Sequence, residues 1–301
     1  MSGTFTAVDL SRLPAPSVVD PQNFEAILAD VRADVLALAP ELADALALES
    51  EPINKVLESF AYRILHERQR ANDQSKQNLL AFASGTTLDH RAAEFGLVRF
   101  VLDPGNALAI PPVPPTLESD ADLRRRIQLA PEAFTTAGST GSYIFHALSA
   151  DPDVLDASVD SPLPGEVVVS VLSRTGNGSA NGALITAVDA KLTATDVRPL
   201  TDAVTVQSAA IITYTVQAVI WTFAGPDSAV VLASANARLD ALLAESHRLG
   251  RDVVRSAIYA ALHADGVQSV DLIAPAADII ITGSEAAYAT ATDITHGGIS
   301  E

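Results

Sequence analysis

The first hundred residues carry apolar side chains at helical spacing, interrupted by prolines. The dipeptide Asp20–Pro21 supplies an acidic cap followed by proline at the first helical position, which is typical of a helix start. Apolar residues then recur with a helical period up to Leu38, and Pro40 begins a second, shorter helix that reaches Leu48. The pattern predicts a helical N-terminal region.

The next predicted helix has an unusual distribution of polar residues. It follows Ser50, has Pro52 in its first turn and carries an apolar stripe, whereas residues 66–78 (HERQRANDQSKQN) include Ala71 as their only apolar residue. An unbroken helix over Pro52–Ser84 would be roughly 50 Å long at 1.5 Å per residue, longer than a small domain is wide. Its polar middle therefore either lies in solvent or pairs with polar side chains of another chain in an assembly. Under the second alternative, the candidate partner interface consists of Ile53, Val56, Leu57, Phe60, Ile64, Arg70 and Gln74.

Beyond residue 117 the apolar pattern alternates between helical and strand periods. Ser119 can cap a helix, and we interpret the trio Arg124–Arg126 as the exposed side of that helix. The remaining patterns predict helices over 143–148, 183–192, 229–243 and 251–263, with Asp227 as a cap, and strands over 154–159, 166–172, 204–207, 211–223, 267–273 and 278–282.

A weak internal repeat organises this part of the chain. The sequence Ala-Leu-x-Ala-Asp occurs at Ala147–Asp151 and at Ala261–Asp265, each time after a predicted helix and before strand, proline turn and strand. The predicted fold class is α+β: an all-helical N-terminal region followed by two small α/β modules with helices packed on short mixed sheets. The predicted division is an extended arm over 1–19, a helical assembly region over 20–103, a proline-rich linker over 104–116, a first module over 117–208, a second module over 209–285 and a C-terminal tail over 286–301.

Composition and charge narrow the possible partners. The net charge of −18, from 37 acidic and 19 basic residues, disfavours nucleic acid, because phosphate-binding surfaces need clustered basic side chains. The absence of cysteine from the sequence excludes disulfides and thiolate zinc sites. The most apolar stretch, Ala209–Ala224, contains several polar residues and predicts a strand, not a membrane span of about 20 residues. The first 20 residues lack the basic patch and apolar run of a secretory signal.

The sequence offers little that resembles a catalytic site. None of the six histidines belongs to an HExxH zinc motif, and there is no GxSxG elbow and no GK[ST] phosphate loop. The glycine-rich segment Gly176–Gly182 follows a predicted strand and precedes a helix, as a dinucleotide loop would, but its GxGxxxG spacing is one residue too long. We interpret it as a turn and keep a ligand-binding enzyme as an alternative. The prediction is that the protein is not an enzyme and has no catalytic, cofactor-binding or metal-ligating residues.

Four stretches, taken in their order and spacing, resemble the phage baseplate assembly protein J family of contractile-tail baseplate wedge proteins. They are 53–70 (INKVLESFAYRILHERQR), 78–96 (NLLAFASGTTLDHRAAEFG), 117–159 (LESDADLRRRIQLAPEAFTTAGSTGSYIFHALSADPDVLDASV) and 164–172 (PGEVVVSVL). The similarity covers most of residues 20–285, and its most specific part runs from 118 to 159.

The resemblance implies a structural protein of the virion, located in the tail baseplate and made and assembled in the host cytoplasm. It implies partners as well: more than one copy of this chain per wedge, other wedge proteins, and the tail hub and spike nearby. The N-terminal helices would join a multi-chain bundle, and the α/β modules would make ring contacts. The sequence leaves open a related contractile injection device or a headless tail particle.

Overall fold

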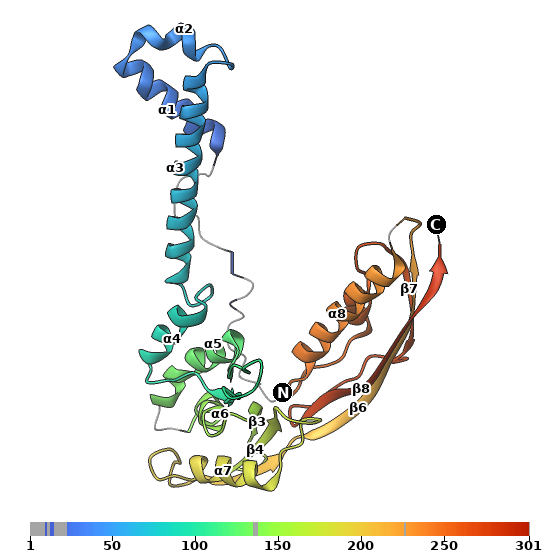
Figure 1. Ribbon diagram of the computed structural model, residues 1–301. Helices are drawn as coiled ribbons and strands as arrows, with labels where there is room; N and C mark the ends of the chain where they lie inside the picture. Colours follow the sequence, from blue (N-terminus) through green and yellow to red (C-terminus); the bar gives the residue numbers. More distant parts are fainter. Residues whose placement is uncertain (1–9, 11–12, 15–22, 135–137, 226, 301) are drawn as a thin grey trace. The chain divides into compact units, whose positions relative to one another are not determined.

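The computed structural model describes residues 10, 13–14, 23–134, 138–225 and 227–300. The chain divides into two compact units, one ending at Val98 and the other beginning at Arg99, and each is described by itself (Figure 1). Apart from residues 10, 13 and 14, the predicted arm over 1–19 lies outside the described residues, as does the predicted helix start at Asp20–Pro21.

The first unit is helical, as the apolar pattern predicts. Asn23 caps its first helix by accepting hydrogen bonds from the backbone N–H groups of Glu25 and Ala26. The long helix begins with Pro52 in its first turn but ends at Gln77, short of the predicted Ser84, and the Gln77 side-chain oxygen accepts a hydrogen bond from the Ser84 N–H across the turn that follows. The elements are α1 (Phe24–Leu38), η2 (Pro40–Leu42), α2 (Ala43–Leu46), α3 (Pro52–Gln77) and α4 (Gly85–Ala93).

The core of this unit lies between α1 and the first half of α3. Ile27 and Leu28 of α1 pack with Leu57 and Ala61 of α3, and all four are buried. The buried Asn54 amide donates to the carbonyl oxygens of Leu46 and Leu48 and so fixes the turn that leads into α3. The second half of α3 continues beyond this small core (Figure 1).

The second unit begins with a hairpin. Strand β1 (Val101–Asp103) pairs antiparallel with β2 (Thr116–Leu117), and Asn106 and Val113 between them exchange two backbone hydrogen bonds of 2.9 Å. The proline-rich segment 104–116 is therefore not the extended linker that we expected, because the chain folds back on itself at its centre.

The first α/β module packs helices on a small sheet. Ser119, Ser139 and Asn181 cap its three helices through side-chain oxygens, each accepting a hydrogen bond from an N–H of the first turn. Its elements are α5 (Asp120–Leu129), η3 (Ala130–Phe134), α6 (Thr140–Leu148), β3 (Val154–Asp160), β4 (Glu166–Ser173), α7 (Gly182–Leu192) and β5 (Ala203–Ser208).

Strand β4 is the centre of this sheet, whose order is β3-β4-β5. It pairs antiparallel with β3 through a short turn and parallel with β5 through the crossover helix α7. Its run of apolar residues is buried, with Val169 and Val171 fully enclosed, as expected of a strand with neighbours on both edges and side chains packed on both faces.

The second module has the same mixture of parallel and antiparallel pairs. Its central strand β6 pairs antiparallel with β7 and parallel with β8, giving the order β7-β6-β8. Alternate β6 residues (Val216, Ala218 and Ile220) are buried under α8 and α9, so this sheet is covered on one face (Figure 1). The elements are β6 (Ala210–Thr222), α8 (Ser228–Ser246), α9 (Arg255–Leu262), β7 (Val267–Ala274) and β8 (Glu285–Ile299).

The structure confirms the α+β class but corrects three details of this second module. Residues 286–300 are not a tail, because β8 adds a full strand beside β6, and the N–H of Ser300 donates to the Thr222 carbonyl. The predicted strand over 278–282 is absent from the described residues, and its Ile279 forms an isolated bridge with Val253. The repeat holds for helix, turn and first strand only, since β3 pairs with the strand that follows it and β7 with the strand that precedes it.

Candidate interaction surfaces

Helix α3 carries an exposed apolar face. Val56, Phe60 and Ile64 are spaced four residues apart, so they lie one above another on the helix, with exposed fractions of 51%, 56% and 37%. Leu57 and Ala61 lie directly beside this stripe on the helix surface and fill the core against α1. The helix therefore has one apolar face covered inside its own unit and a second that is open.

This arrangement divides the residues of the predicted partner interface. Val56, Phe60 and Ile64 are exposed, as an interface requires. Leu57 is buried in the core of the unit and is not available to a partner, and Ile53 is partly buried against that core. Sequence periodicity could not separate the two groups, because all five share one broad apolar stripe.

The open face continues into the polar half of α3. Arg63, Ile64, Glu67, Arg68 and Ala71 form a shallow, open surface along this part of the helix. The last two residues of the predicted interface lie on this half of the helix. Arg70 is exposed and forms an ion pair of 3.6 Å with Glu67, and Gln74 is exposed.

The β1–β2 hairpin presents a second apolar surface. At its tip, Leu108 and Ile110 have exposed fractions of 93% and 100%. The loop is held in shape from within: the Asp103 carboxylate accepts from the Gly105 N–H, and the Asn106 side chain accepts from the Leu108 N–H. Sequence reasoning missed this surface, although the Asp-Pro-Gly-Asn turn chemistry beside two aliphatic residues was available as a signal.

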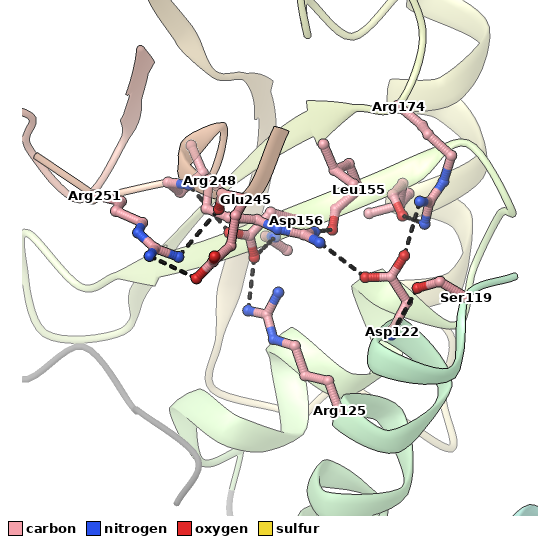
Figure 2. Close-up of polar contacts among 12 residues, drawn as sticks. Ser119, Asp122, Arg125, Leu155, Asp156, Arg174, Glu245, Arg248 and Arg251 are labelled. Atoms are coloured by element: carbon pink, nitrogen blue, oxygen red, sulfur yellow. Dashed lines mark hydrogen bonds and ion pairs between the residues drawn. The ribbon is translucent and has the colours of Figure 1, made fainter. Parts of the chain in front are cut away.

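A network of charged side chains joins the two α/β modules (Figure 2). Asp122, in the first turn of α5, accepts hydrogen bonds of 2.9 Å from both Arg174 and Arg248. Arg248, which follows α8 in the second module, also donates to the Leu155 carbonyl on β3. Asp156 on β3 accepts from Arg125 and from the backbone N–H of Leu249. Segments 126 positions apart in the chain are thereby bound together.

The electrostatics of this network favour ionised carboxylates. Burial by itself would raise the pKa of the Asp122 carboxyl, but the charges and hydrogen bonds of Arg248 and Arg174 outweigh burial, and the pKa lies below its ordinary value of 3.8. Only 12% of the Asp122 side chain is exposed, so each of these hydrogen bonds forms in a partly desolvated setting.

The interpretation of Arg124–Arg126 as the exposed side of a helix is wrong. Arg126 is buried and forms an ion pair of 2.7 Å with the equally buried Glu118, and its guanidinium lies 3.9 Å from the centre of the Phe100 ring. Burial lowers the pKa of Arg126, and Glu118 partly offsets that effect. Arg125 is half-buried in its contact with Asp156. Arg125 and Arg126 face the protein because residues before α5 and on β3 supply carboxylates and an aromatic face for them.

The glycine-rich segment Gly176–Gly182 is packed against protein. Gly178 has a positive φ of 97°, and a Cβ there would lie 2.6 Å from the Leu172 side chain and 2.8 Å from Nε2 of His247. Asn181 at its end caps α7. The need for glycine thus arises from a close approach between the two modules, which favours the turn interpretation over a ligand loop.

Known proteins similar to this chain decide its family. Three domain profiles match: the Baseplate J-like N-terminal domain at residues 49–106, the Baseplate J-like central domain at 135–208 and the Baseplate J-like protein C-terminal domain at 214–295. The chain is also 46% identical to "Baseplate protein J" of Escherichia phage P2 over 98% of its own length and 99% of that protein. The chain belongs to the baseplate J-like family.

The family is one of structural phage proteins, and membership gives the chain a structural role in a phage tail baseplate. A chain in the cryo-EM structure of the anti-feeding prophage baseplate, 6-fold symmetrised, is 18% identical with a TM-score of 0.38, over 60% of this chain and 44% of that one. Helix α3 falls in the Baseplate J-like N-terminal domain, the hairpin tip lies just beyond the end of that match, and Arg248 falls in the C-terminal domain.

Among the described residues, no group of three His, Asp or Glu side chains is arranged to hold a metal ion. In the same part of the chain, no helix combines the length and the apolar character needed to cross a membrane.

Proposed function

We propose that the protein is a wedge component of the inner ring of a contractile tail baseplate, around the hub, and that it performs no catalysis. It assembles with other copies of itself and with other wedge proteins, in the host cytoplasm, and then resides in the tail of the virion. The family and the 46% identical relative support the baseplate role. A related contractile injection device or headless tail particle would use the same contacts, and the identity of the proteins encoded beside this one separates these cases.

The observation that carries this proposal is the open face of α3. Val56, Phe60 and Ile64 expose a stripe of apolar side chains on a helix whose other apolar face is already covered. An amphipathic helix is stabilised when such a stripe is buried by partner helices, as in a multi-chain bundle. Below the stripe, Arg70 and Gln74 offer polar contacts to the same partners.

The test replaces apolar side chains of the stripe with charge. Phe60→Glu and Ile64→Glu should weaken complex formation with co-expressed wedge proteins by about 30-fold or more, because a buried aromatic or aliphatic anchor contributes about 2 kcal/mol or more to binding. The measurement is light scattering of the complexes after size-exclusion chromatography.

Tyr62→Glu is the matched control. Tyr62 has the same exposed fraction as Phe60, 56%, but two residues further along the helix it lies about 200° around the axis. The Tyr62 variant should assemble normally. Normal assembly of both stripe variants, or equal losses in all three, would contradict the assignment of this face to a partner.

We also propose the hairpin tip as a second contact within the baseplate. Leu108 and Ile110 are held outward on a loop whose turns are closed by internal hydrogen bonds, so little conformational entropy is lost when they dock. Because the sequence contains no cysteine, Ala109→Cys would place a single thiol at this tip. The thiol should react readily with maleimide in the free chain and be protected in assembled particles; equal reactivity in both would exclude a docked tip.

A further inference from the structure

The two α/β modules are joined by a single residue of chain. Strand β5 ends at Ser208 and β6 begins at Ala210, so that Ala209 alone connects the two sheets. Its N–H donates to the Val171 carbonyl of the first module, while the N–H of Ala210 donates to the Ser284 carbonyl of the second. A connection this short permits rotation about a few backbone dihedrals and little translation, which is the property of a hinge.

The apolar contact at this joint is small. Its buried members are Leu172, Ala209 and Ala286, two of which are alanines, and the partly buried Leu155, Ile211 and Leu249 pack against them. The second module has a much larger core of its own between its sheet and the helices α8 and α9, centred on residues such as Ile220 and Leu239. Since hydrophobic stabilisation grows with buried apolar area, each module holds itself together more strongly than the joint holds the pair.

Polar contacts made by one segment complete the joint. In the segment His247–Arg251, Arg248 donates to Asp122 and to the Leu155 carbonyl, and the Leu249 N–H donates to Asp156. His247 supplies a further contact, since its ring lies against Gly178 while its Nδ1 is 2.7 Å from the Ala287 carbonyl oxygen of its own module. Figure 2 shows Arg248 reaching from the second module to the carboxylate of α5 and to β3.

We propose that His247–Arg251 is a releasable latch and that Ala209 is its hinge. With the latch closed, the two modules form one rigid body. When Arg248 leaves Asp122, the second module swings about Ala209 as an intact domain. Opening exposes little apolar surface, and it strands no carboxylate, because Asp122 keeps Arg174 and Asp156 keeps Arg125. The proposal concerns the isolated chain and does not depend on its partners in the baseplate.

The unaltered protein provides the first test. Native-state hydrogen exchange should show that the N–H groups of Leu249 and Ala209, which donate to Asp156 and Val171 of the first module, exchange by a local opening, about tenfold or more faster than the core amides of β6 such as Ile220. The exchange rates of the joint amides and of the β6 core amides should become equal only near the midpoint of denaturant unfolding. If the joint amides exchange only together with the β6 core at every denaturant concentration, the modules form one cooperative unit and there is no latch.

A second test observes the swing directly. Ala190→Cys on α7 and Ala233→Cys on α8 place two exposed thiols, one per module, in a chain that otherwise lacks cysteine. Spin labels at these positions should give a narrow distance distribution with Arg248 present and a broad or shifted one in the Arg248→Ala background. Arg251→Ala is the matched control, because Arg251 belongs to the same segment but contacts Glu245 of its own module.

The two outcomes are distinct. A broadened distribution for Arg248→Ala, with the distribution of Arg251→Ala unchanged and the exchange rates of the β6 core preserved, supports the latch. A distribution as narrow as that of the parent, in a folded Arg248→Ala protein, overturns it. Should the variant lose protection throughout β6, the contact is part of the fold and the proposal is equally wrong.

Discussion

Replacing Arg126 by methionine should lower the free energy of unfolding far more than the replacement of an exposed arginine would. The substitution keeps a long side chain over the Phe100 ring but removes the charge that faces Glu118, whose side chain is 2% exposed. Glu118 would keep the hydrogen bond from the N–H of Phe100 at 3.1 Å. A buried carboxylate left without its counter-charge costs about 3–5 kcal/mol.

The assay is urea-induced unfolding followed by circular dichroism. A loss of that size should lower the midpoint by on the order of 1 M, given typical denaturant slopes. Arg251→Met provides the control, because Arg251 is 45% exposed and its ion pair with Glu245 contributes at most about 1 kcal/mol.

A second substitution tests the cause. Adding Glu118→Gln to Arg126→Met removes the stranded charge and keeps an acceptor for the Phe100 N–H, so the double variant should recover about half of the lost stability or more. The reasoning is refuted if Arg126→Met costs no more than Arg251→Met, or if Glu118→Gln adds to the loss.

Three further predictions concern the latch, the core and the hairpin. The pKa of Asp122 is lower in the folded protein than its ordinary value of 3.8. The stabilisation that Asp122 gives the joint should therefore be complete above pH 3.8 and be lost as the pH falls through the lower, folded-state pKa. Hydrogen exchange at the joint should accelerate in that acid range, and Asp122→Asn should remove this acid dependence. Leu239→Ala should cost about 2–5 kcal/mol in urea unfolding, whereas Val230→Ala on the same helix, 67% exposed, should cost little. Gly105→Ala should destabilise the hairpin, because φ is +66° and a Cβ would meet the Val113 carbonyl oxygen; proteolysis within the loop should become faster than in Ala107→Ser.

The sequence by itself determined the local elements. Ser119 and Asp227 cap the helices that were expected from them, because capping depends on residues only two or three positions away. The apolar patterns over 166–172 and 211–223 predicted strands, and β4 and β6 form there, since strand periodicity is also local. Family resemblance gave the baseplate role, which the matched domains confirm.

The partition of the α3 stripe required the tertiary structure. Leu57 and Phe60 look alike in the sequence, yet one is buried against α1 and the other is open. The side of α3 against which α1 packs decides which of these residues is buried, and the apolar pattern of α3 alone does not indicate that side.

Strand pairing and charge burial were decided only by contacts between distant parts of the chain. Strand β8 pairs with β6, and the paired residues Ala210 and Glu285 are 75 positions apart in the chain. The internal repeat had suggested instead that the last strands would pair with each other across a proline turn. Arg126 is buried because Glu118 and Phe100 meet it in space, and Arg248 finds Asp122 across 126 positions. Local patterns report which face of an element is apolar. They do not report which distant charge or strand edge will come to lie against it, because that depends on how the whole chain closes.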